Sequence, residues 1–198
     1  MTTLEDRIAV VALGSNQDFG QFSPKEILFQ AIDCLATLGL QLMGVSRLYH
    51  TPCFPAGAGP DYVNAAAALV VPAAMTAPQL LAALHQVEAQ FGRARTTRWA
   101  GRTLDLDLIA FGEEVAPDLA GFRHWQQLPP EAQSKLAPAE LILPHPRLQD
   151  RAFVLVPMAD VAPDWRHPVL GLTVVQMLAD LPDAARVEVV ALASDASV

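Results

Sequence analysis

Two aspartates in a short alternating segment are the residues best placed to do chemistry. Asp105 and Asp107 alternate with leucines between Leu104 and Leu108. On an extended strand, residues two apart project from the same face, and their backbones lie about 6.6 Å apart. That spacing suits one or two hard cations, and Mg²⁺ prefers a few protein oxygens with its other positions left to water and phosphate. The alternative is an ordinary solvated strand face, because exposed carboxylates are common on half-buried strands.

A cluster of arginines leads directly into this pair. Four of the eleven arginines fall within ten residues, at Arg93, Arg95, Arg98 and Arg102. Guanidinium groups bind phosphate oxygens bidentately, and a metal ion neutralises the charge that develops as a phosphoryl group transfers. The sequence has no Gly-x-x-x-x-Gly-Lys-Ser/Thr segment, so arginine and metal would replace that backbone cradle. A basic surface loop paired with acidic neighbours is the competing interpretation.

Two further polar residues suggest a site for a flat heterocycle. Tyr62 and Asn64 are also two apart in a β-like segment, and Asn64 is followed by a run of alanines. The amide of Asn64 offers a donor and an acceptor side by side, and a phenol ring can stack on a planar ligand. Tyr62 alone is equally well explained by packing in the core or at an edge.

The remaining polar candidates carry less information. His145 lies between two prolines, and Arg151 follows, so this turn offers two groups that can touch phosphate. Trp99, set among the arginines, suits either a lid over a ligand or a small apolar cluster under the loop. His85 and Glu88 share a helix face, but such a lone pair is usually not a metal site.

Composition limits the class of protein. The 198 residues are 52% hydrophobic and 17% charged, which favours one compact domain over residues 1–198. No apolar run approaches the roughly 20 residues of a membrane span, and two cysteines suggest no disulfide framework. We therefore expect a cytoplasmic protein with no membrane partner. The net charge of −8 argues against nucleic acid as a partner.

The order of elements predicts how these residues are positioned. Strands are expected at 8–13, 40–49, 62–71 and 104–111, and helices at 24–38 and 77–91. This β-α-β-β-α-β order is typical of an α+β, ferredoxin-like domain, with an antiparallel sheet and both helices on one face. Further helices are expected at 151–162 and 173–181, and an edge strand at 187–192. Residues 113–140 are interpreted as an insertion or long loop, and 182–198 as a tail.

Together these strings resemble the 6-hydroxymethyl-7,8-dihydropterin pyrophosphokinase family, over residues 8 to about 165. The resemblance is carried by Ala12-Leu-Gly-Ser-Asn16, Tyr49-His-Thr-Pro52, Pro60-Asp-Tyr-Val-Asn-Ala65, Arg102-Thr-Leu-Asp-Leu-Asp-Leu108, Pro144-His-Pro-Arg147 and Arg151-Ala-Phe153. It implies an ATP-dependent pyrophosphokinase of folate biosynthesis. The implied reaction is attack of the pterin hydroxymethyl oxygen on the β-phosphorus of ATP, with AMP leaving.

The resemblance also implies roles for individual residues. The catalytic residues would be Arg93, Arg102, Asp105 and Asp107, with the two aspartates holding two Mg²⁺ ions. The ATP-binding residues would be Glu88, Arg93, Arg102, Leu108, His145 and Arg151. The pterin-binding residues would be Thr51, Pro52, Tyr62, Asn64, Trp99 and Phe153. The partners would be small molecules, ATP and the reduced pterin. The protein would be a monomer, with a dimer through residues 113–140 left open.

Some features depart from the family pattern. Ala100-Gly101 replaces a more usual Gly-Pro, Cys53 stands where a second proline is often found, and residues 113–140 are longer than the typical connection. This insertion leads into the Pro-His turn, so it is expected to touch ATP or a partner. Two other functions fit the pattern: a non-catalytic module that senses a nucleotide or pterin, and a related enzyme acting on another acceptor alcohol.

Overall fold

The computed structural model describes residues 7–53, 57, 59–92, 102–129, 132 and 136–193. The helices are α1 (Pro24–Thr37), α2 (Ala77–Gln90), α3 (Leu119–Gln127), α5 (Ala152–Val161), α6 (Val174–Asp180) and α7 (Asp183–Val187), with a 3₁₀ turn at Leu148–Asp150. The strands are β1 (Arg7–Ser15), β2 (Gln41–Val45), β3 (Tyr49–Thr51), β4 (Tyr62–Val71), β5 (Asp105–Phe111) and β6 (Val190–Ala191). Within the described ranges, no helix is both long and apolar enough to cross a membrane.

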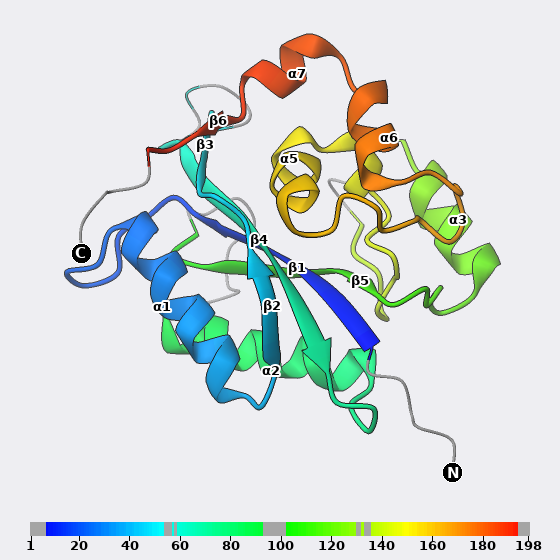
Figure 1. The fold of residues 1–198 in the computed structure, drawn as a ribbon, viewed down its shortest axis with the longest axis horizontal. Coiled ribbons are helices and arrows are strands. Elements are labelled where there is room, and N and C mark those ends of the chain that lie inside the picture. The colour runs from blue at the N-terminus through cyan, green and yellow to red at the C-terminus, as the bar shows by residue number, and fades with distance from the viewer. Residues whose placement is uncertain are drawn as a thin grey trace.

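The strands form one antiparallel sheet in the order β5-β1-β4-β3-β6, and β2 pairs with the same edge of β4 as β3. Helices α1 and α2 lie on one side of this sheet, and α5 and α6 lie on the other (Figure 1). The predicted ferredoxin-like α+β fold is therefore confirmed, with additional C-terminal helices on the second face. The predicted edge strand is also present, as β6 beside β3.

Local sequence signals determine where the helices begin. The backbone N–H of Ser23 donates to Glu26 (2.8 Å), that of Thr76 to Gln79 (2.8 Å) and that of Thr173 to Gln176 (2.9 Å). Each is a capping box, which satisfies backbone donors that a helix start would leave without partners. The predicted starts of α1, α2 and α6 are therefore confirmed.

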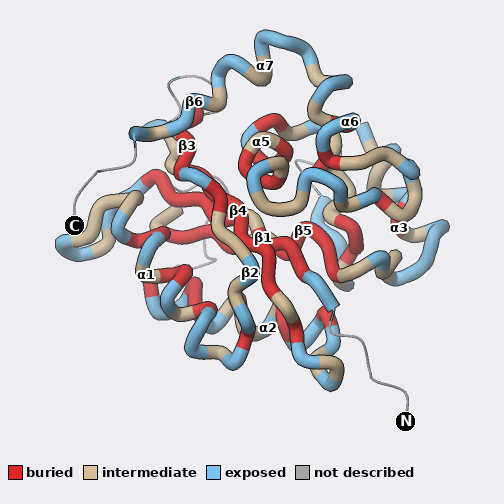
Figure 2. The backbone as a smooth tube through the Cα atoms, in the orientation of Figure 1, coloured by how far each residue is buried: buried red, intermediate tan, exposed pale blue. Residues whose placement is uncertain are grey.

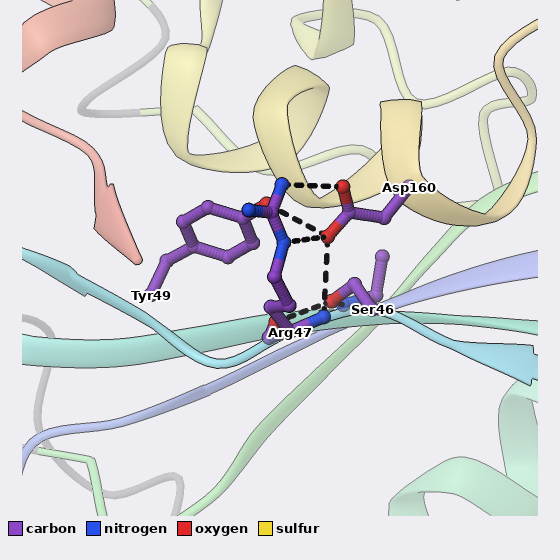
Figure 3. A network of polar contacts seen from close by, with 5 residues as sticks. Ser46, Arg47, Tyr49 and Asp160 are labelled. Atoms are coloured by element: carbon purple, nitrogen blue, oxygen red, sulfur yellow. Dashed lines mark hydrogen bonds and ion pairs between the residues drawn. The ribbon is translucent and has the colours of Figure 1, made fainter. Parts of the chain in front are cut away.

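The expectation of one continuous strand over residues 40–49 is wrong, because the chain leaves the ladder between β2 and β3. The backbone N–H of Arg47 donates to Oδ2 of Asp160 on α5 (3.2 Å), and its guanidinium bonds the same carboxylate. The hydroxyl of Tyr49 donates to Asp160 as well (2.7 Å). Figure 3 shows these groups converging on one carboxylate. A partner on a distant helix thus replaces strand pairing at Arg47.

Residues 113–140 and 182–198 contain more regular structure than expected. The first segment includes α3, and the Oδ1 of its N-cap residue Asp118 accepts from the N–H of Gly121 (2.7 Å). The second includes α7, in addition to the predicted edge strand β6. The absence of a clear apolar period in 113–140 does not prevent a helix there, because a single side chain, Phe122, provides most of its burial.

Two apolar cores hold the layers together, one on each face of the sheet. The larger lies between the sheet and α1 and α2, and the smaller lies between the sheet and α5 and α6. Figure 2 shows buried residues along the central strands and on the inner sides of the helices. Because both faces of the central strands are covered, polar side chains that lie there, such as Asn64 and Asp105, are themselves largely buried.

Candidate active site

The paired aspartates lie on β5, at the edge of the sheet. Leu104, Leu106 and Leu108 point into the core beneath α1 and α2. Asp105 and Asp107 therefore project from the opposite face, which is the face covered by α5. Their partners on β1 are Gly14 and Ala12. The two carboxylates share one face, as the alternating sequence predicts.

Positive charge converges on these carboxylates from two directions. Arg102 forms an ion pair with Asp105. Burial acts to lower the pKa of Arg102, but the charges of Asp105 and Asp107 outweigh it and raise that pKa. Arg151 precedes α5, and burial lowers its pKa while the charge of Asp107 opposes the change. Both guanidinium groups are close enough to interact with both carboxylates.

The donor set fits magnesium. Among the described residues, no three His, Cys, Asp or Glu side chains gather as a metal cluster, and Asp105 and Asp107 form a pair of carboxylates on one strand face. Asp107 also lines an open cleft. Two carboxylates with space beside them are what Mg²⁺ requires when the remaining ligands are water and phosphate oxygens.

The Pro-His turn is held against the same strand. The N–H of His145 donates to the carbonyl of Ile109 on β5 (2.8 Å), and the N–H of Arg147 donates to Nδ1 of His145 (3.1 Å). Burial, followed by the charge of Arg151, lowers the pKa of His145 to about 3. The imidazole is therefore neutral, and because Nδ1 accepts, its proton is on Nε2.

A cleft of about 480 Å³ lies along this edge of the sheet, within the usual range of roughly 300–1,000 Å³ for ligand pockets. Its lining includes four of the predicted ATP or metal residues: Asp107, Leu108, His145 and Arg151. Sequence reasoning missed other members of the lining, notably His85 on α2, Trp125 on α3 and Arg147. The first two belong to helices distant in sequence from the Pro-His turn, so spacing along the chain could not associate them.

Two of the predicted pterin residues, Tyr62 and Asn64 on β4, lie two strands away from the aspartates, on the same face of the sheet. Nδ2 of Asn64 donates to Oγ1 of Thr51 (2.6 Å), which fixes the amide. Tyr62 is the register partner of Thr51. Between β4 and β5, Gly14 on β1 is in register with both Asn64 and Asp105.

Gly14 leaves room for the amide of Asn64. A Cβ at Gly14 would lie 3.0 Å from Oδ1 of Asn64 and 4.0 Å from atoms of Asp105 and Tyr62. A side chain here would therefore displace the amide of Asn64, while it would only touch Asp105 and Tyr62. The Gly-Ser-Asn string was recognisable in the sequence, but only the register of three strands explains the glycine.

Asn16 joins the loops around the site. Its Nδ2 donates to the carbonyl of Pro60 (3.0 Å), and its Oδ1 accepts from the N–H of Arg102 (2.8 Å). Asp61 accepts from the N–H of Cys53 (3.0 Å) and lies 3.1 Å from Nε2 of His50. These bonds position the segments that enter β4 and β5. Sequence reasoning assigned no role to Asn16 beyond membership of its motif.

Other predicted residues are placed as follows. Glu88 is only 2% exposed, and its carboxylate accepts from the N–H of Leu106 (2.8 Å), so it anchors β5 to α2. Pro52 is exposed beside Thr51. Phe153 is 42% exposed on the first turn of α5, with the guanidinium of Arg151 5.6 Å from its ring centre. Arg93 and Trp99 lie outside the described residues.

Comparisons with known proteins agree with this arrangement. Residues 10–163 match the model of the 7,8-dihydro-6-hydroxymethylpterin-pyrophosphokinase (HPPK) family. The chain is 37% identical over 172 residues to the 2-amino-4-hydroxy-6-hydroxymethyldihydropteridine pyrophosphokinase of Synechocystis, covering 86% of this chain and 74% of that protein. It is 38% identical over 159 residues to the enzyme of the same name from Pseudomonas aeruginosa, covering 80% of this chain and 82% of that protein.

A crystal structure of Plasmodium falciparum HPPK-DHPS shares the fold, with a TM-score of 0.61 at 14% identity. The alignment covers 88% of this chain and 44% of that longer one, so the chain spans less than half of its length. The family match and the two bacterial relatives cover most of this sequence, including the aspartate pair, the Pro-His turn and the Asn64 strand. The chain therefore belongs to the 7,8-dihydro-6-hydroxymethylpterin-pyrophosphokinase family.

Proposed function

We propose that this protein transfers a pyrophosphate group from ATP to 6-hydroxymethyl-7,8-dihydropterin in folate biosynthesis, giving the pterin diphosphate and AMP. The observation that carries the proposal is the register of Gly14, which pairs with Asp105 on one side and with Asn64 on the other. Neighbouring strands are about 4.8 Å apart, so Asp105 and Asn64 are separated by about 10 Å across the sheet. An acceptor held at Asn64 thus lies beside phosphates held at the aspartates.

The reaction needs one bond made and one broken. The hydroxymethyl oxygen of the pterin attacks the β-phosphorus of ATP, the bond from that phosphorus to the oxygen bridging to the α-phosphate breaks, and AMP leaves with that oxygen. The hydroxyl proton is lost to solvent. Because the phosphoryl groups themselves undergo little covalent chemistry with the protein, catalysis depends on position and charge.

Each charged residue has a role in this scheme. Asp105 and Asp107 would hold Mg²⁺, two ions by the resemblance, which supplies charge neutralisation at the triphosphate. Arg102 and Arg151 provide fixed positive charge on the same side of the sheet. His145, neutral and with its proton on Nε2, acts as a hydrogen-bond donor to a phosphate oxygen. Arg93 is expected to assist them.

The pterin is held by uncharged groups. Asn64, oriented by Thr51, reads the edge of the ring, and the backbone around Thr51 and Pro52 borders it. The rings of Tyr62 and Phe153 are expected to stack on its two faces, and Trp99 to close over it. Phe153 has the exposed surface that stacking requires.

One assay tests the proposal directly. The purified protein is incubated with ATP, Mg²⁺ and reduced hydroxymethylpterin, and the products are separated. AMP and the pterin diphosphate are expected in equal amounts. Tight binding of both ligands without AMP would instead indicate a sensing module, and AMP formed only with another alcohol would indicate a different acceptor.

We also propose that the enzyme is a cytoplasmic monomer. Light scattering would check the oligomeric state, and localisation in cells would check the compartment.

A further inference from the structure

The chain makes an excursion between Ala116 and Leu143, and two described parts of it, α3 and residues 136–142, reach the cleft beside it. The N–H of Ala116 donates to the carbonyl of Leu143 (3.0 Å), and the N–H of Leu143 donates to that of Ala116 (3.1 Å). The chain thus leaves and returns at one point, immediately before Pro144 and His145. Because the excursion ends at the Pro-His turn, its residues can line the same cleft as His145.

The helix within this excursion is fixed to the body of the protein. Phe122 on α3 is 0% exposed and packs edge-on against His167, with ring centres 5.5 Å apart. His167 packs in turn against Trp165, whose Nε1 donates to the carbonyl of Gly112, directly after β5 (3.0 Å). A chain of buried contacts therefore holds α3 at a set position relative to β5.

Trp125 lies one helical turn beyond Phe122 and reaches the cleft. Charged lining residues from β5, the Pro-His turn and the start of α5 are Asp107, Arg147 and Arg151, and Glu140 adds a carboxylate from the returning part of the excursion. Large apolar lining residues come from α2, α3 and the returning part of the excursion: Leu81, Trp125, Leu136, Leu141 and Ile142. Leu136 is 52% exposed despite its apolar side chain.

A ligand that uses this whole lining must be anionic at one end and flat and apolar at the other. Phosphate and metal cannot use an indole or leucine surface, whereas a nucleobase gains from both. A nucleoside triphosphate has both parts.

We propose that α3 and residues 136–142 carry the base-binding wall of the nucleotide cleft, with the indole of Trp125 stacking on the nucleobase of ATP and Leu136 bordering it. The inference rests on the proposed function, since that function makes ATP the occupant of the cleft. Trp125 would thus recognise the base, which the phosphate-binding residues cannot do.

Paired binding measurements test this wall. The affinity of each protein for a non-hydrolysable ATP analogue is measured with Mg²⁺ by calorimetry, and the affinity for inorganic triphosphate is measured in the same buffer. Three variants are compared with the unmodified protein: Trp125→Ala, Trp125→Phe and Gln127→Ala. Gln127 is the matched control, because it is exposed on the same helix and does not line the cleft.

Trp125→Ala is expected to weaken binding of the ATP analogue about 10-fold, since stacking on a base is worth about 5- to 150-fold in affinity. Binding of inorganic triphosphate should be unchanged, Trp125→Phe should recover most of the loss, and Gln127→Ala should have no effect. Unchanged affinity for the ATP analogue in Trp125→Ala, or an equal loss for inorganic triphosphate, would overturn the inference. If the unmodified protein released no AMP, the proposed function would fail, but these binding ratios would still decide the role of Trp125.

Discussion

The two halves of the site are built from different forces. Around Asn64, uncharged groups are fixed by short hydrogen bonds such as the one to Thr51, and Gly14 keeps the space open. Around Asp107, which lines an open cleft, the full charges of Arg102 and Arg151 act on the aspartate carboxylates. A neutral ring is thus recognised by the positions of hydrogen-bonding groups, whereas a triphosphate is recognised by an electrostatic field that a metal ion completes.

The largest effect is expected on the charged half. Asp107→Ala should reduce the rate of AMP formation about 10²- to 10³-fold, because a fixed electrostatic stabiliser is lost. Circular dichroism should show an unchanged fold, and the affinity for the pterin should stay within about 2-fold. Asp33→Ala removes an exposed carboxylate from α1 and should leave the rate unchanged. Normal turnover by Asp107→Ala would show that the charged half is not the phosphate site.

Acid should lower the free energy of unfolding through His167, which packs against Phe122 of α3. Burial lowers the pKa of His167 to about 4, against about 6.5 in an unfolded chain. Between these values the unfolded state binds more protons, so the free energy of unfolding falls as the pH is lowered from about 6.5 to about 4. His167 alone accounts for about 3 kcal/mol over that window, and His145 acts in the same direction.

Urea denaturation at several pH values measures this dependence. His167→Asn should flatten the slope between about pH 6.5 and 4, because the group that titrates is gone. His124→Asn, at an exposed position on α3, should keep the slope of the unmodified protein. Equal slopes for all three proteins would show that His167 does not stay neutral in the fold.

A change in the neutral half should affect only the pterin. Asn64→Ala removes an oriented amide and should raise the KM for the pterin about 10-fold, which corresponds to one lost hydrogen bond. The KM for ATP should change by less than about 2-fold. Steady-state kinetics with each substrate varied in turn separate the two constants. A parallel rise in both would mean that the halves are not independent.

The smallest effect is expected at the strand between the halves. Gly14→Ala places a Cβ 3.0 Å from Oδ1 of Asn64, so the amide must move by a few tenths of an ångström. The KM for the pterin should rise about 5-fold, a cost at the low end for overpacking. The same assay applies, and an unchanged KM would show that the Asn64 oxygen does not contact the pterin.

Sequence patterns predicted the features that depend on neighbours along the chain. The starts of α1 and α2 and the shared face of Asp105 and Asp107 follow from spacings of two or three residues. The break between β2 and β3 was not predictable, because its cause is Asp160, 113 residues beyond Arg47. Likewise α3 depends on burial of Phe122 against His167, a contact that no local period reveals.

The candidate site divides in the same way. Residue types and a family resemblance identified Asp107, His145 and Arg151, which do line one cleft. Asn16 and Trp125 were missed, because the first acts through Pro60 and Arg102 and the second reaches the cleft from another segment. Contacts between segments that are distant along the chain bring such residues together, and a single sequence does not reveal those contacts.

We propose that Asp105 and Asp107 together hold the divalent ions that accompany ATP, and a count of bound ions tests this most directly. Electron paramagnetic resonance counts bound Mn²⁺ in the presence of a non-hydrolysable ATP analogue, for the unmodified protein and for Asp105→Asn and Asp107→Asn. Two ions per chain are expected in the unmodified protein and at most one in either variant. Two ions bound with unchanged affinity in both variants would contradict the account.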